Sequence, residues 1–291
     1  MLFKINKLRC FYTNPNEPVL LVDNLIINKG ELTFIIGPSG VGKSTFLETL
    51  GMMNNTICSN TDKIEEGELS FYPNNSSKAT NLYQRWKMEE KYTSYLRRKH
   101  FSFIFQNNNL MKSLNAYENI DITQMIQGVN KVQAREKTLK IINSLALEKD
   151  IYDKEKNKIK KISELSGGQQ QRISFARAIV TDFTVLFGDE PTGNLDSKNA
   201  HNLMSILKTK LIEDKKSAII VSHDINLAIE YADNIVLIQS ELSEKENVIR
   251  KFGRINEASV FSKNKTKWNN NGNEFTNQQL KRNLFDKMTL I

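Results

Sequence analysis

The segment Gly37-Pro-Ser-Gly-Val-Gly-Lys-Ser-Thr45 constrains this chain of 291 residues more than any other part of its sequence. It fits the pattern G-x-x-x-x-G-K-[ST], follows the apolar run LTFII and leads into the helical-looking stretch STFLETLGMM. In that setting the glycines let main-chain N–H groups surround phosphate oxygens, and the N-terminus of the helix adds a positive partial charge. A chance glycine-rich turn is the alternative, and the flanking strand and helix disfavour it.

The side chains of this loop have separate expected roles. Lys43 reaches the β- and γ-phosphates, and such a close charge pair is worth about 4 kcal/mol before desolvation at an effective dielectric constant of about 20. The Ser44 hydroxyl is a ligand for Mg²⁺, and Thr45 binds the α-phosphate. The predicted nucleotide-binding residues here are Gly37, Pro38, Ser39, Gly40, Val41, Gly42, Lys43, Ser44 and Thr45.

Short apolar runs at 32–36, 101–105, 184–187 and 218–221 predict the strands of the core. Three of them are apolar on both faces, which is typical of a parallel sheet covered by helices, whereas the run 101–105 is expected nearer an edge. Stretches with helical spacing lie between these runs. The alternation of strand and helix predicts an α/β fold.

Two carboxylates, Asp189 and Glu190, follow the predicted strand 184–187. Successive residues at a strand end point in opposite directions, so the two side chains can serve different roles. We expect Asp189 to hold Mg²⁺ through water and Glu190 to polarise the attacking water, a task whose loss costs about 10²–10⁴-fold in rate. An acidic pair alone is more often a solvated turn, but a phosphate-binding loop upstream favours catalysis.

The stretch Leu165-Ser-Gly-Gly-Gln-Gln-Gln-Arg172 places a serine and two glycines where a helix is expected to open, near Gln169. By itself it is a glycine-rich helix cap or a second anion-binding helix N-terminus. Together with the phosphate-binding loop and the Asp-Glu strand end, it resembles the signature motif of ATP-binding cassette (ABC) ATPases. The resemblance covers roughly residues 1–250, with the motifs in the expected order.

The resemblance implies a P-loop NTPase (RecA-like) core with an N-terminal antiparallel β subdomain and an inserted α-helical subdomain. It implies ATP and Mg²⁺ as cofactors and hydrolysis of ATP to ADP and phosphate. Gln106 matches the glutamine that contacts Mg²⁺ and faces the membrane partner, and His223 matches the histidine that contacts the γ-phosphate. The implied catalytic residues are Glu190, His223 and Gln106, and the implied metal ligands are Ser44, Gln106 and Asp189.

Other positions match contacts to the nucleotide or to a second cassette. Tyr12, or its neighbour Phe11, matches the aromatic residue that stacks on adenine, and residues 193–196 match the D-loop between paired cassettes. The signature residues contact the γ-phosphate held by the opposite cassette, so one chain supplies half of each site. They are Ser166, Gly167, Gly168 and Gln169.

The stretches FIFQNNNLMKSLNAYENI, LSGGQQQR and DEPTGNLD look most like cassettes of lipoprotein-releasing, macrolide-export and antimicrobial-peptide-resistance transporters. This likeness implies a second cassette, most simply in a homodimer, and a separate integral membrane permease, with export or extraction as the task. The chain departs from that group at Gly188, where a residue such as alanine is usual, and in a longer spacing between Lys43 and Gln106.

These features predict one ABC ATPase domain over residues 1–250, with a helical subdomain at about 107–165 and a polar insert at about 54–98. Polar composition predicts that residues 251–291 form an extension that is flexible or docks on a partner. Within it, the stretch KNKTKWNNNGNEFTNQQ reads as a linker and QQLKRNLFDKMTLI as a short helix.

The charge and cysteine content bear on partners and compartment. The net charge of +8 comes from basic residues scattered among acids, which predicts a solvated surface and no nucleic-acid partner. Cys10 and Cys58 are too few for a disulfide framework, and no apolar run reaches the roughly 18 residues of a membrane span. With no secretory signal either, we expect a cytoplasmic protein on the inner face of the plasma membrane.

The alternative function is a soluble, non-transport ABC ATPase acting on nucleic acid or ribosomes. Repair and chromosome types separate their motifs with long coiled coils, and no sustained heptads lie between Lys43 and Asp189. Ribosome-associated types usually carry two cassettes in one chain, whereas this chain has one. A neighbouring permease gene would favour transport.

Overall fold

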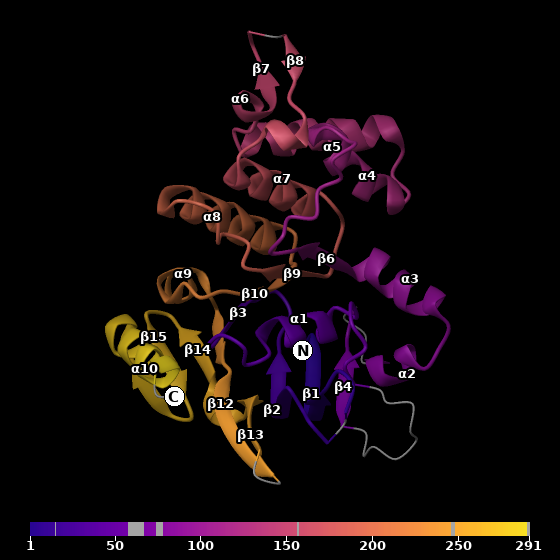
Figure 1. Cartoon of the computed structure of the whole chain (residues 1–291). Coiled ribbons are helices and arrows are strands. Elements are labelled where there is room, and N and C mark those ends of the chain that lie inside the picture. Colours follow the sequence, from indigo (N-terminus) through magenta and orange to yellow (C-terminus); the bar gives the residue numbers. More distant parts are fainter. Residues whose placement is uncertain (15, 58–66, 74–77, 156, 246–247, 290–291) are drawn as a thin grey trace.

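A central sheet of eight strands carries the site in the computed structural model, which describes residues 1–14, 16–57, 67–73, 78–155, 157–245 and 248–289 (Figure 1). Its order is β16-β15-β14-β11-β3-β10-β9-β6. The strands from β11 to β6 are parallel, as the apolar runs predict, and β6 lies at the edge. They are β11 (Asn234–Leu237), β3 (Leu32–Ile36), β10 (Ser217–Val221), β9 (Val185–Asp189) and β6 (Phe101–Ile104).

Both faces of this parallel region are buried, so the strands read as continuous apolar runs. Phe34, Leu186 and Ile220 belong to the cluster with the outer helices, whereas Ile35 and Ile219 pack in the cluster that includes α1. The outer helices are α7 (Gly167–Ile179), α8 (Ser197–Glu213) and α9 (Ile225–Tyr231), and α1 spans Lys43–Leu50. The α/β class is therefore confirmed.

A second sheet of six strands lies on the α1 side and includes the N-terminal strands (Figure 1). Its order is β12-β13-β2-β1-β4-β5, and only the β13–β2 pair is parallel. The chain thus has the expected antiparallel subdomain, but a hairpin from residues 239–255 also belongs to it. The strands are β12 (Gln239–Lys245), β13 (Val248–Ile255), β2 (Leu20–Ile27), β1 (Phe3–Cys10), β4 (Glu68–Phe71) and β5 (Thr80–Asn81).

A helical region follows β6 and stands at the top of Figure 1, beyond α7. It contains α4 (Ala116–Ile126), α5 (Lys131–Ser144), α6 (Glu148–Ile151) and the short 3-10 helix η1 (Ile162–Glu164). Asn115 and Asn130 cap the N-termini of α4 and α5 through their side chains. The expectation of helices alone is wrong in one detail, because β7 (Tyr152–Asp153) and β8 (Lys158–Ile159) pair as a small hairpin.

The polar insert contains two helices, α2 (Leu82–Trp86) and α3 (Glu90–His100). α3 is rich in charged residues and ends directly before the start of β6. Leu96 is buried on its inner side, whereas Tyr95 is exposed. Residues 58–66 and 74–77, with Cys58 among them, lie outside the described residues, and Cys10 is a free, buried thiol.

The C-terminal residues fold onto the core, so the expected flexible linker is wrong. The 3-10 helix η2 (Glu257–Ser259) leads to β14 (Val260–Asn264), β15 (Lys267–Asn270) and β16 (Asn273–Phe275), which extend the central sheet. Trp268 is fully buried and donates to Asn277 Oδ1 over 3.0 Å. Leu280 and Leu284 of α10 (Asn277–Thr289) are buried in the same cluster. A few large apolar residues thus order a segment whose average composition is polar.

Among the helices within the described ranges, none combines the length and the apolar character that crossing a membrane requires.

Candidate active site

The loop between β3 and α1 forms a tight turn around its glycines. Gly40 and Gly42 have φ of +78° and +89°, in the left-handed region where only glycine is unstrained, and Gly42 is the N-cap of α1. A Cβ on Gly37 would stand 2.6 Å from the carbonyl oxygen of Ile238, so the loop also packs closely on the end of β11. These contacts direct the first N–H groups of α1 toward the space above the sheet.

Lys43 is buried at the base of this loop. Its ammonium donates to the carbonyl oxygens of Gly37 and Pro38, over 2.9 and 2.8 Å. Burial lowers the pKa of Lys43, and the nearby carboxylates of Glu190 and Asp189 partly oppose that effect. The ammonium is thus held in the loop, where it can neutralise phosphate charge.

A cavity of about 270 Å³ lies against the loop and brings together motifs far apart in the sequence. The C-terminal ends of parallel strands meet at one edge, which is why β9 and β10 deliver their polar residues to the loop after β3. The cavity is lined by Val19, Ser39, Gly40, Gly42, Lys43, Ser44, Thr45, Gln106, Asp189, Glu190, Val221 and His223. The expected ligands Ser44, Gln106 and Asp189 therefore line one cavity.

Glu190 and His223 face each other in this cavity, with Glu190 Oε1 3.3 Å from His223 Nε2. Burial raises the pKa of Glu190, aided by Asp189, while a hydrogen bond from the His223 main chain and the charge of Lys43 oppose the rise. Burial also lowers the pKa of His223, and Lys43 adds to that effect. The two groups thus titrate closer together than free side chains do, which suits a general base beside a neutral imidazole.

Tyr12 lies next to the loop as the aromatic match requires. Its side chain is 57 % exposed, and its hydroxyl is 2.8 Å from Thr45 Oγ1. Phe11 is buried in the core, so of the two residues only Tyr12 presents a ring near the site. Its stacking on adenine stays a prediction.

The signature residues lie outside this cavity. Ser166 caps α7 by accepting from the Gln169 N–H, and Gln169 Oε1 accepts from the Ser166 N–H over 2.9 Å. Ser166 and Gly167 are exposed, and neither lines the cavity at the phosphate-binding loop. The predicted residues therefore separate into two groups, one around Lys43 and one at the N-terminus of α7.

The residues around Lys43 fit a magnesium nucleotide. Around Gly40 the space that a Cβ would occupy is open within 4 Å, which allows a phosphate to approach the main chain. Glu190 Oε1 is buried and accepts no hydrogen bond, although His223 Nε2 lies 3.3 Å away, so this oxygen has a free acceptor position in the cavity. Ser44, Gln106 and Asp189 offer the oxygen ligands that Mg²⁺ prefers. Val19 and Val221 also line the cavity, and no sequence signal pointed to them.

The fold and the site define a P-loop ATPase. The core sheet, the glycine loop with its lysine, and the carboxylates at the end of the neighbouring strand form one cavity. A sequence profile described as ABC transporter matches residues 21–193, which is more than half of the chain. The chain belongs to the ABC transporter family and is an ATP-binding, ATP-hydrolysing cassette.

Named relatives agree with this assignment. "Uncharacterized ABC transporter ATP-binding protein MJ0796" of Methanocaldococcus jannaschii is 34% identical over 232 residues, which are 79% of this chain and 88% of that protein. "Macrolide export ATP-binding/permease protein MacB" of Shewanella sp. (strain W3-18-1) is 35% identical over 232 residues, but the match spans only 32% of that protein. The solved "Dimeric Structure of MJ0796, a Bacterial ABC Transporter Cassette" has a TM-score of 0.66 at 31% identity and covers 81% of this chain and 94% of that chain.

Proposed function

We propose that two copies of this chain close head to tail on two ATP molecules and thereby drive a separate membrane permease. The observation that carries the proposal is the separation of Ser166 and Gly167 from the cavity around Lys43. A capped helix N-terminus with an exposed serine and glycine is suited to bind an anion, but this chain's own phosphate site lies elsewhere. The phosphate of a second copy is the matching ligand, and the MJ0796 cassette is described as dimeric.

Each predicted residue then has a chemical task. Lys43 and the N–H groups of residues 40–45 hold the phosphates, and Ser166 with Gly168 closes the site from the other copy. Glu190 accepts a proton from the attacking water, and neutral His223 keeps that water and the γ-phosphate in line. A Mg²⁺ held by Ser44, Gln106 and Asp189 would neutralise charge on the phosphate oxygens.

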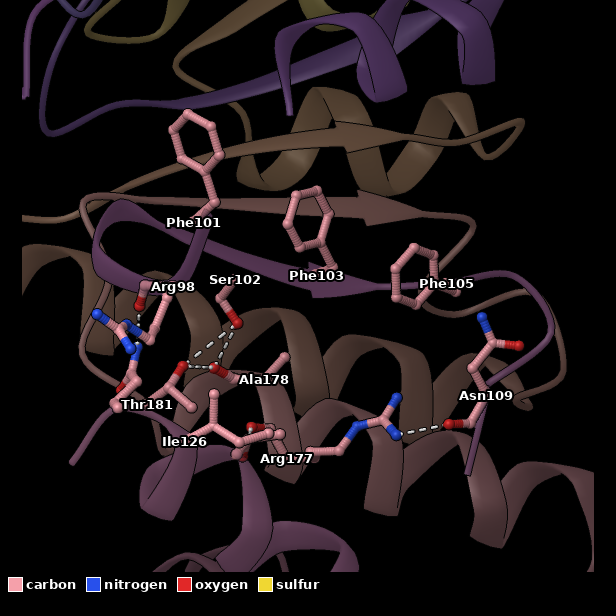
Figure 2. Close-up of a pocket in the computed structure, with 12 residues that line it drawn as sticks. Arg98, Phe101, Ser102, Phe103, Phe105, Asn109, Ile126, Arg177, Ala178 and Thr181 are labelled. Carbon is pink, nitrogen blue, oxygen red and sulfur yellow. Dashed lines mark hydrogen bonds between the residues drawn. The ribbon is translucent and has the colours of Figure 1, made fainter. Parts of the chain in front are cut away.

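A groove beside the loop that follows Gln106 is the proposed docking place for the permease. It has a volume of about 240 Å³ and lies between β6, α4 and α7 (Figure 2). Phe103 and Phe105 line one side, Ile126 lies below them, and Arg177 donates to the Asn109 carbonyl oxygen over 2.7 Å. Arg177 thus ties α7 to the segment after Gln106, so a partner bound here would contact both α7 and that segment.

The direction and location of the activity are also part of the proposal. Several relatives carry the name of a macrolide export ATP-binding/permease protein, and residues of this chain match about a third of such proteins. We therefore propose export or extraction from the membrane, with the cassette peripheral on the cytoplasmic face. These names also favour transport over action on nucleic acid or ribosomes.

Gel filtration of Glu190→Gln protein with ATP and Mg²⁺ tests the dimer. Without the general base, hydrolysis slows about 10²–10⁴-fold, so the ATP-bound dimer persists and elutes early. Adding Lys43→Ala abolishes nucleotide binding and the dimer together. Adding Ser166→Arg instead leaves nucleotide binding intact but prevents dimerisation. A Glu190→Gln protein that binds ATP and stays monomeric would contradict the proposal.

Copurification from detergent-solubilised membranes tests the permease. Ile126→Arg places a charge in the docking groove, at a side chain that is 58% exposed, so the fold and the intrinsic ATPase are retained while the permease is lost. Ile212→Arg is the matched control, because Ile212 is 64% exposed on α8 and does not line the groove. Equal permease recovery with both variants would exclude the groove as the docking place.

A further inference from the structure

Gln171 is a fully buried polar side chain on the helix that carries the signature residues. Its side chain reaches the turn after β9. Burying an amide is costly unless its polar atoms are paired, so its position depends on its partners. Both ends of the amide are paired with main-chain groups of that turn.

The nitrogen end of this amide contacts the main chain of the catalytic carboxylate. Gln171 Nε2 donates to the carbonyl oxygen of Glu190 over 2.9 Å. The same oxygen accepts from the Gly193 N–H, and the Glu190 N–H donates to the Val221 carbonyl oxygen. Glu190 has φ of +50°, a left-handed conformation that a non-glycine residue holds only when its surroundings impose it. The bonds to its N–H and carbonyl groups hold the main chain of Glu190 on both sides of this conformation.

The oxygen end of the amide contacts the predicted D-loop. Gln171 Oε1 accepts from the Asn194 N–H over 2.9 Å. One turn earlier on α7, a Cβ on Gly168 would stand 3.2 Å from the Asn194 carbonyl oxygen, so the helix and this turn are packed without free space. α7 therefore cannot shift without moving the main chain from Glu190 to Asn194.

We infer that Gln171 is a positioning residue that fastens the signature helix to the main chain of Glu190 and of Asn194. The inference rests on the proposed function, because α7 and Glu190 then serve two different nucleotides of one dimer. When Ser166 binds the phosphate held by the partner copy, α7 takes a defined position. Through the amide of Gln171, that position fixes the main chain of Glu190, which acts on the nucleotide bound by this copy's own loop. Gln171 itself touches no reactant.

Steady-state kinetics of Gln171→Met protein test this role. Methionine keeps the volume but removes both hydrogen bonds, and misplacement of the carboxylate lowers kcat by about 10- to 100-fold while the KM for ATP stays within about twofold. Gln124→Met is the matched control, because Gln124 is also buried and its amide donates to Ala134 O and Thr138 Oγ1, within the helical region. The kcat of Gln124→Met is expected to be that of wild type.

Two further readouts separate positioning from folding. The Asn194 amide exchanges its hydrogen roughly two- to tenfold faster in Gln171→Met, whereas it stays protected in Gln171→Glu and in Gln124→Met. In Gln171→Glu the substituted carboxyl can donate to the Glu190 carbonyl only when protonated, so its kcat relative to wild type rises as pH falls from 8.5 to 6.5.

The inference is overturned if Gln171→Met and Gln124→Met have equal kcat, if Asn194 exchange is unchanged, or if the Gln171→Glu ratio is independent of pH. Failure of the proposed function is distinguishable. If the wild-type protein hydrolyses ATP without forming a dimer, the proposed dimer is excluded. The hydrogen exchange of the Asn194 amide would still report directly on the Gln171 bond.

Discussion

Gly253 of β13 lies directly against the carbonyl oxygen of Val41 in the phosphate-binding loop. A Cβ built on Gly253 would stand 2.0 Å from that oxygen and 2.7 Å from Ile238 Cγ2. β13 therefore supports a loop that precedes it by more than two hundred residues. The Gly253 Cα and the Val41 carbonyl are both main-chain groups that cannot rotate away. The contact therefore leaves room only for a hydrogen atom on the Gly253 Cα.

Gly253→Ala is therefore expected to displace the phosphate-binding loop and to weaken ATP binding by roughly 5- to 150-fold, since overpacking of this size costs about 1–3 kcal/mol. Titration with a fluorescent ATP analogue measures it. Arg254→Ala is the control, because Arg254 pairs with Asp23 and Glu241 at the surface and such pairs contribute about 0–1 kcal/mol. Equal affinity of both variants would show that β13 does not support the loop.

Tyr12 is expected to bind adenine through its ring and not through its hydroxyl. Stacking of a base on an aromatic side chain is worth about 1–3 kcal/mol by alanine substitution, so Tyr12→Ala raises the Kd for ATP by roughly 5- to 150-fold. Tyr12→Phe keeps the ring and loses only the hydrogen bond with Thr45, so its Kd stays within about threefold of wild type. Similar affinities for Tyr12→Ala and Tyr12→Phe would contradict stacking.

His100, at the end of α3, makes stability depend on pH. Burial lowers its pKa, and the charges of Lys99 and Lys216 add to that effect, although Asp182 opposes it. Below the unfolded pKa of 6.5 the unfolded chain binds more protons at this site than the folded chain, so the contribution of His100 to stability is lost as pH falls through that value.

Urea unfolding of wild type and His100→Gln at pH 7.5 and 5.5 checks this. The free energy of unfolding is expected to fall more in wild type than in the variant over that interval. Glutamine can still pair with Thr184 Oγ1, which lies 2.9 Å from His100 Nδ1, so the comparison isolates the titration. The same pH dependence in both proteins would assign the change to other groups.

Gly188 of β9 stands where the similar cassettes usually have a residue such as alanine, and restoring alanine tests whether that difference matters. A Cβ there would stand 2.7 Å from Ile220 Cδ1, the flexible end of a side chain on the neighbouring strand. We expect Gly188→Ala to be tolerated at a cost of about 1–3 kcal/mol in stability while kcat is retained, because Ile220 can change rotamer. Thermal unfolding measures the loss of stability, and ATPase assays measure kcat. A variant with wild-type stability and a lower kcat would contradict the prediction.

The sequence predicted the parallel core and most of the cavity. Strand runs such as 32–36 and 218–221 carry their own signal, and the residues around Lys43, Glu190 and His223 stand at the ends of such runs, where parallel strands must converge. The prediction of a linker around Trp268 was wrong because the average composition of a segment does not reveal that one large apolar side chain is buried in the core.

Local sequence by itself determined which segments can bind phosphate, since the glycine turn at residues 37–45 and the serine cap at Ser166 depend on neighbours within a few residues. Only the tertiary structure decided what these segments touch. The bond from Gln171 to Glu190 and the support of Val41 by Gly253 join separate elements of the fold, and in each contact the group that is met is a main-chain carbonyl oxygen. Main-chain groups are the same in every residue, so no pattern of side chains records where they meet.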